Sequence, residues 1–118
     1  MLRIQAAQMT ELSRVAIEDF VERVREHLRE EQPRRTAALR DEALDALTRE
    51  ALVRAPRYGL ESEYDVVRLT ELLFALGPTF DASPQAQEAL MNPELHPDDK
   101  LAAVLALHQD EAALEVAI

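Results

Sequence analysis

The chain of 118 residues has no cysteine, no tryptophan and only two glycines. The lack of cysteine excludes disulfide bonds, thiolate metal sites and cysteine nucleophiles. Two glycines leave few of the tight turns that β-hairpins require. No apolar run approaches the roughly 18 residues that cross a bilayer, and the start, Met1-Leu2-Arg3-Ile4-Gln5, lacks the apolar stretch of a secretory signal. We therefore expect a cytoplasmic protein.

Aromatic side chains are also scarce, at 4% of the chain, and alanine and leucine dominate the apolar 47%. Both are strong helix formers, whereas β-branched residues are sparse and rarely alternate with polar ones. The length is that of one domain. The sequence therefore predicts an all-α protein, with a single compact domain over residues 1–118 built as an orthogonal bundle of five or six helices.

Apolar periodicity predicts a long amphipathic helix over residues 5–30, ended by Pro33, with a short turn of helix after it. Asp41 is expected to cap the next helix. Pro56 removes a backbone donor near the end of that helix, so the helix should kink or finish early. Gly59 should then take a left-handed conformation just beyond the helix end.

The next segment has clear start and stop signals. Ser62 opens an acidic first turn with the spacing of an imperfect capping box. Residues 66–76 are apolar almost all round, which predicts a helix at the centre of the bundle, and Gly77-Pro78 should end it. The pairs Ser83-Pro84 and His96-Pro97 each predict the start of a further helix.

The acidic charge lies almost entirely in the second half of the chain. Residues 61–118 hold twelve acidic residues against one arginine and one lysine, which accounts for the net charge of −10. Residues 1–60 balance eleven arginines against eleven acidic residues. Such an imbalance predicts a surface suited to a basic partner and unsuited to a nucleic-acid backbone. A surface that only keeps the protein soluble would have the same composition.

Few residues have the pattern of a reaction centre. His96, Asp98 and Asp99 could gather on a metal ion, but their spacing matches no ligand pattern, and first-turn helix charge accounts for both aspartates. The chain has no nucleophile motif, no phosphate-binding loop and no di-iron signature. We therefore expect no catalytic residue, no metal and no cofactor.

Two other features have ordinary structural explanations. His27 lies near the C-terminus of the first predicted helix, where the helix dipole favours a cation. Arg34-Arg35 and Arg40 form a small basic spot, which a solvated loop explains better than DNA binding in a chain of this charge.

Two segments carry a resemblance to a known family: Arg57-Tyr58-Gly59-Leu60-Glu61-Ser62-Glu63-Tyr64-Asp65-Val66 and Leu72-Leu73-Phe74-Ala75-Leu76-Gly77-Pro78-Thr79-Phe80-Asp81. They resemble small helical proteins encoded in bacterial type VI secretion effector clusters, beside PAAR-repeat and spike proteins. The opening Ile4, Met9, Phe20, Arg23 and His27-Leu28 is similar to the first helix of that family. The resemblance covers most of residues 1–81 and implies an accessory role without catalytic residues: binding an effector, its chaperone or the secretion spike.

We therefore predict a non-enzymatic adaptor or co-chaperone for a secreted effector, which binds a basic protein surface and neither nucleic acid nor membrane. The candidate contacts on its acidic helical face are Glu61, Glu94, Asp98, Asp99, Asp110 and Glu111. The alternatives are an immunity protein that occupies a basic toxin site and a metal-dependent enzyme that uses His96 and nearby acids. The apolar strip over residues 114–118 would serve docking or a homodimer, or would close the bundle.

Overall fold

Helices form all the regular structure in the part of the chain that the computed structural model describes, which is the backbone of residues 13–117 and the side chains of residues 13–109. The all-α prediction is confirmed, because this range has six α-helices, one 3-10 turn and no strand. The elements are α1 (Arg14–Glu31), α2 (Pro33–Thr36), α3 (Asp41–Arg54), the 3-10 turn η2 (Ala55–Tyr58), α4 (Glu63–Leu76), α5 (Pro84–Leu90) and α6 (Pro97–Ala117).

The first described helix begins later than the sequence predicted. Ser13 has an extended backbone, with φ −69° and ψ 165°, and its Oγ accepts a hydrogen bond from the amide of Ala16 at 3.2 Å. A serine bonded in this way lies outside the helix that it caps. The prediction of one continuous helix over residues 5–30 is therefore wrong at Ser13, and residues 5–12 lie outside the described range. At the other end, Pro33 follows the last turn of α1 as predicted.

Asp41 is the first residue of α3, and the prediction that it caps this helix is wrong. The N-cap is Arg40, which makes no side-chain cap bond. The Asp41 carboxylate instead accepts a 2.7 Å hydrogen bond from Arg29, and this bond holds the pKa of Asp41 below its usual value. The same guanidinium donates to the carbonyl oxygens of Thr36 and Leu39. Arg29 therefore joins the end of α1 to α2 and to the start of α3.

The end of α3 follows the prediction. Pro56 cannot donate a helical hydrogen bond, so α3 stops at Arg54 and the chain continues as the 3-10 turn η2. Gly59 then takes a left-handed conformation with φ +69°. A residue with a Cβ is strained at this φ, which explains the glycine. This turn aims the chain back toward the start of α4.

α4 is the central helix, as its apolar sequence predicted. Its N-terminus has a full capping box, in which Ser62 Oγ accepts from the Asp65 amide and the Asp65 carboxylate accepts from the Ser62 amide. Its buried positions lie on several sides of the helix and include Val66, Leu69 and Leu73. α4 packs against α3, η2 and α6, so it is in contact with both halves of the chain.

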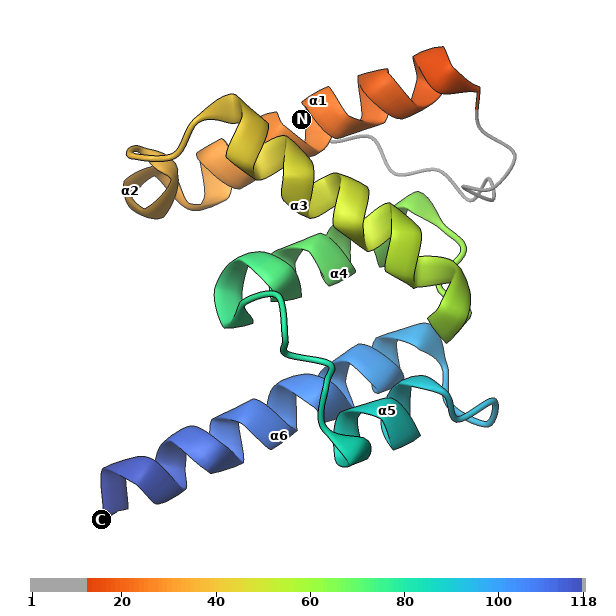
Figure 1. Cartoon of the computed structure of the whole chain (residues 1–118), viewed down its shortest axis with the longest axis vertical. Helices are drawn as coiled ribbons and strands as arrows, with labels where there is room; N and C mark the ends of the chain where they lie inside the picture. The colour runs from red at the N-terminus through yellow and green to blue at the C-terminus, as the bar shows by residue number, and fades with distance from the viewer. Residues whose placement is uncertain (1–12, 118) are drawn as a thin grey trace.

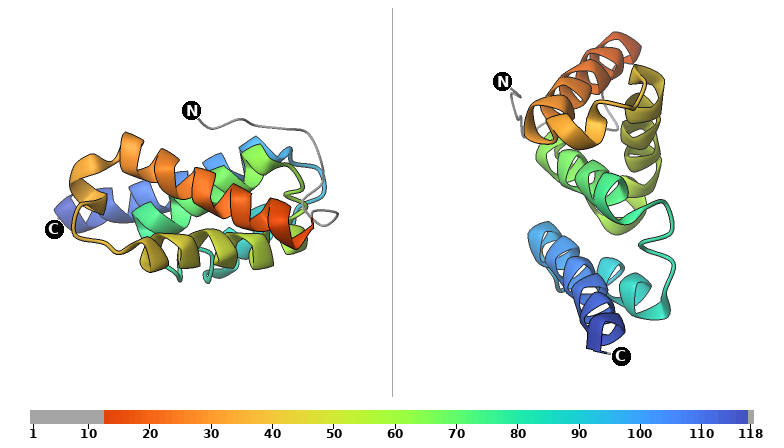
Figure 2. Two further views of the ribbon diagram at one scale, coloured as in Figure 1. Left: turned by 90° about the horizontal axis from the view of Figure 1, so that it is seen from above. Right: turned by 90° about the vertical axis from the view of Figure 1, so that its left-hand side faces the viewer.

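The helices form two packed groups. We call residues 14–76, which comprise α1 to α4, the N-terminal unit, and α5 with α6 the C-terminal hairpin. Figure 1 shows α1, α3 and α4 stacked across one part of the molecule and the hairpin beside α4, with the end of α6 extending beyond it. The right-hand view in Figure 2 shows the same two groups. A continuous apolar core includes residues from both of them, among them Phe20, Leu44 and Val104. Within the described residues, no helix is both long and apolar enough to cross a membrane.

The central position of α4 gives a first prediction. Leu69 is fully buried, so Leu69→Ala removes core contacts and leaves a cavity. We expect the free energy of unfolding to fall by about 2–5 kcal/mol, measured by urea denaturation. The control is Leu39→Ala, because Leu39 is 38% exposed and should cost less than about 1 kcal/mol. Equal losses in the two variants would contradict a core centred on α4.

Candidate docking surface

The structure brings four of the six predicted contact residues onto neighbouring segments. Glu61 lies in the turn before α4, Glu94 lies in the loop between α5 and α6, and Asp98 and Asp99 lie in the first turn of α6; all four are exposed. Lys100 Nζ joins the two segments by donating to the carbonyl oxygen of Tyr58 at 2.8 Å. We call Glu61, Glu94, Asp98 and Asp99 the acidic turn surface.

The other two predicted contacts lie elsewhere. Asp110 and Glu111 belong to the second half of α6, which continues without a break to Ala117. At 1.5 Å per residue, Asp110 is about 16 Å further along the helix axis than Asp99. The side chains of both residues, and the apolar strip over residues 114–118, lie outside the described side chains. The six predicted residues therefore do not form one patch.

Several acidic residues of the second half are used inside the fold. Glu63 is 4% exposed and pairs with Arg23 at 3.1 Å. Asp81 is 7% exposed and pairs with Arg54 at 3.0 Å. Both arginines come from the first half of the chain. The charge imbalance of the sequence is therefore partly neutralised by ion pairs between the halves, and the exposed acidic charge is smaller than the sequence suggests.

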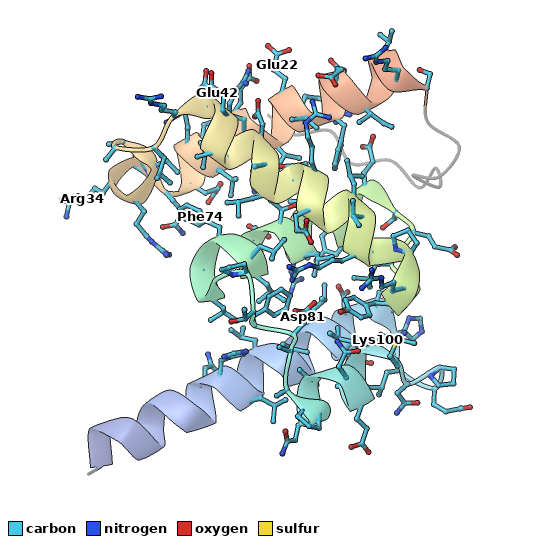
Figure 3. All side chains as sticks on the ribbon, in the orientation of Figure 1. Glu22, Arg34, Glu42, Phe74, Asp81 and Lys100 are labelled. Carbon is cyan, nitrogen blue, oxygen red and sulfur yellow. The ribbon has the colours of Figure 1, made fainter. Side chains whose placement is uncertain are left out.

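The only lysine of the chain does not offset the negative charge of the acidic turn surface, because its side chain is buried. Lys100 follows Asp99 in the sequence, but its side chain points inward, is 7% exposed and ends on the Tyr58 carbonyl oxygen. Figure 3 shows Lys100 between the N-terminal unit and the hairpin. Arg68 reaches Asp98 at 3.7 Å, in a pair whose aspartate side chain is 62% exposed. Exposed ion pairs of this kind contribute little energy, so Asp98 stays available to a partner.

The basic spot lies at another place, around α2. Arg34, Arg35 and Arg40 are exposed, as predicted, but Arg34 and Arg35 lie in α2 and not in a loop. The guanidinium of Arg35 lies 4.6 Å from the ring centroid of Phe74 and covers part of this aromatic side chain. Figure 3 shows Arg34 at the outer end of the molecule, away from Lys100. Arg34, Arg35 and Arg40 therefore do not neutralise the acidic turn surface.

The histidines have separate surroundings. His27 Nε2 lies 3.5 Å from Glu71 on α4, a contact that the dipole argument did not predict. His108 Nε2 lies 2.7 Å from the carbonyl oxygen of Phe80. His96 is exposed in the loop before α6. Among the described residues, no group of three or more histidine, aspartate or glutamate side chains is arranged to hold a metal ion.

A groove that the sequence did not predict runs beside α1 and reaches α3. It has a volume of about 350 Å³, and its lining residues are Val15, Glu18, Asp19, Val21, Glu22, Arg25 and Asp45. Arg25 binds Asp45 at 2.9 Å, and Glu18 binds Arg49 at 2.7 Å. The sequence did not predict this acidic groove, because arginines and acidic residues are equal in number over residues 1–60. Three of its four acids, Glu18, Asp19 and Asp45, are already partnered by arginines, which makes it a weaker docking candidate than the acidic turn surface.

A partly buried group of hydrogen bonds joins the N-terminal unit to the hairpin. The Asp81 carboxylate accepts from Tyr58 Oη at 2.7 Å and from Arg54 Nη1 at 3.0 Å. Gln87 Nε2 donates to Tyr58 Oη at 3.1 Å and to the Asp81 carbonyl oxygen at 2.8 Å. We call Arg54, Tyr58, Asp81 and Gln87 the junction cluster. Figure 3 shows Asp81 between the N-terminal unit and the hairpin. No local signal in the sequence predicts it, because its members are 23 or more residues apart across the junction.

Comparison of the chain with protein-family models, curated proteins and solved structures finds no match. The resemblance to accessory proteins of type VI secretion clusters therefore stays a prediction.

The junction cluster gives a pH prediction. Burial, and then the hydrogen bond to Asp81, raise the pKa of Tyr58 above its usual value of 10.0. In the unfolded chain Tyr58 loses its proton first, so this residue's contribution to folding is complete below pH 10 and declines as the pH rises further. Urea denaturation between pH 8 and 11 should show this decline, and Tyr58→Phe should make it shallower.

Tyr64→Phe is the matched control, since the Tyr64 hydroxyl accepts a hydrogen bond from Arg68 outside the junction cluster. The control should keep the alkaline decline of the wild-type protein. An alkaline decline of the same steepness in Tyr58→Phe would contradict the prediction.

Proposed function

We propose that this protein is a non-enzymatic, stoichiometric binding factor whose acidic turn surface docks a basic protein partner. The position of the exposed acids carries the proposal. Glu94, Asp98 and Asp99 remain on the surface, whereas Glu63 and Asp81 are buried against arginines. Negative charge left at one place on a helical surface speeds association with a positive partner and selects against other partners.

An exposed apolar side chain near this surface supports the same proposal. Met91, at the end of α5, is 55% exposed and precedes the loop that carries Glu94. Protein interfaces commonly combine a methionine or aromatic centre with a charged rim. Met91 would supply the apolar contact, and the acids of the turn surface would supply the rim.

The family resemblance supports a more specific form of the proposal. The partner would be a secreted bacterial effector, its chaperone or the secretion spike, and the protein would act as adaptor or co-chaperone. An immunity protein would use the same acidic surface to occupy the basic site of a toxin. An adaptor is required for export of the effector, whereas an immunity protein rescues cells that express the toxin domain alone.

The test is co-expression with the products of neighbouring genes, followed by calorimetry on the purified complex. We expect Glu94→Gln/Asp98→Asn/Asp99→Asn to weaken the affinity at least about tenfold, because three interfacial charges are lost. Binding should also weaken between 50 and 500 mM salt, because salt screens exposed charges.

The matched control is Glu22→Gln/Glu26→Gln/Glu30→Gln, which removes three exposed acids of α1 and changes the net charge by the same amount. This control should bind within about threefold of the wild-type protein. If both triple variants bind as the wild type does, or both weaken equally, the acidic turn surface is not the docking site.

A further inference from the structure

The segment between α4 and α5 has the properties of a hinge. Gly77 has φ +95°, and a Cβ placed on it would meet no atom within 4 Å, so the backbone there is uncrowded. Pro78 and Thr79, which follow it, are exposed. Short exposed segments of this kind absorb the dihedral changes of hinge motions.

The residues just after this segment are attached to the hairpin. The carbonyl oxygen of Phe80 lies 2.7 Å from His108 on α6, and that of Asp81 accepts from Gln87 on α5. These bonds would move together with α5 and α6. The boundary between the two groups of helices therefore falls at residues 77–79.

Across this boundary the hairpin is held at a few places. α5 packs mainly on α6, and α6 packs on α4. Both groups also contribute to the common apolar core. The polar links across the boundary include the contacts of Asp81 with Tyr58 and Arg54, the bond from Gln87 to Tyr58 Oη, the bond from Lys100 to the Tyr58 carbonyl oxygen, and the pair Arg68–Asp98. Water can replace polar links with a smaller net loss than apolar ones, because exposed groups form new hydrogen bonds.

We propose that the C-terminal hairpin opens from the N-terminal unit as one body. Residues 77–79 are the hinge, and the hydrogen bonds of the junction cluster stabilise the closed form. Opening breaks the bonds from Tyr58 and Arg54 to the Asp81 carboxylate and uncovers α6 residues such as Leu101 and Val104, which are buried in the closed form. It leaves the packing of α1, α3 and α4 intact. This motion is independent of the proposed docking function.

Amide hydrogen exchange of the full chain, followed by mass spectrometry, tests the motion. Amides of residues 86–90 and 101–108 should exchange at least about tenfold faster than those of residues 20–28 and 66–73, because α5 and α6, once detached from α4, lose the packing that keeps their helical hydrogen bonds closed, without global unfolding. Tyr58→Phe should raise hairpin exchange about another tenfold, since Asp81 loses a buried donor, and should leave residues 20–28 unchanged.

Glu63→Gln is the control, because it weakens the buried pair with Arg23 within the N-terminal unit. It should raise exchange in α1 and α4 more than in the hairpin. Wild-type hairpin amides as slow as those of α1, or a Tyr58→Phe effect spread evenly over all helices, would overturn the proposal.

A cross-link gives a second test that does not require the junction cluster to be altered. Because the chain has no cysteine, Arg68→Cys/Asp98→Cys can be joined specifically by a flexible bis-maleimide across the α4–α6 contact. The bridge should slow hairpin exchange to the level of the N-terminal unit. The same variant capped with two single maleimides should keep fast exchange, and equal rates in the two forms would overturn the hinge.

Discussion

The carboxylate of Asp81 connects the N-terminal unit to the segment that leads into the C-terminal hairpin. Arg54 donates to it from the end of α3 and Tyr58 from η2, and Gln87 donates to the backbone of the same residue. The position of this carboxylate depends on the early end of α3 at Pro56, because η2 turns Tyr58 toward the hairpin. The early end of α3 before Pro56 thus contributes to the position of α5 and α6 on the N-terminal unit, together with the packing of α6 on α4.

The surface charge of this protein depends on which charged side chains are buried, more than on their positions in the sequence. Arginines of the first half extend into the fold to meet Glu63 and Asp81, whereas Arg34 and Arg40 stay at the α2 end. The lysine that offsets charge in the second half is internal. Exposed arginines therefore lie at the α2 end, and Glu94, Asp98 and Asp99 are exposed between α5 and α6 and in the first turn of α6. Such a distribution orients an approaching charged partner.

The parts that the sequence predicted are those decided locally. Ser62, Pro56 and Gly59 act within a few residues of themselves, so their effects on helix ends were predictable. Asp41 has the residue type of a helix cap, but its carboxylate binds Arg29 of another helix. A local sequence pattern cannot predict this contact, because Arg29 is brought to Asp41 by the packing of the helices. Contacts such as Tyr58–Asp81 depend on how helices pack, and the exposure of the turn acids depends on which neighbours fold over them.

The burial of Lys100 limits the amine chemistry of the folded protein. It is the only lysine, and its ammonium group donates to a backbone carbonyl oxygen beneath Gly59 instead of meeting solvent. Acylating reagents and acyl-transferring enzymes require a neutral, reachable amine. The closed form of the protein therefore offers them no accessible ε-amino group, and acetylation at this residue would report separation of α6 from η2 instead of a modification of the native surface.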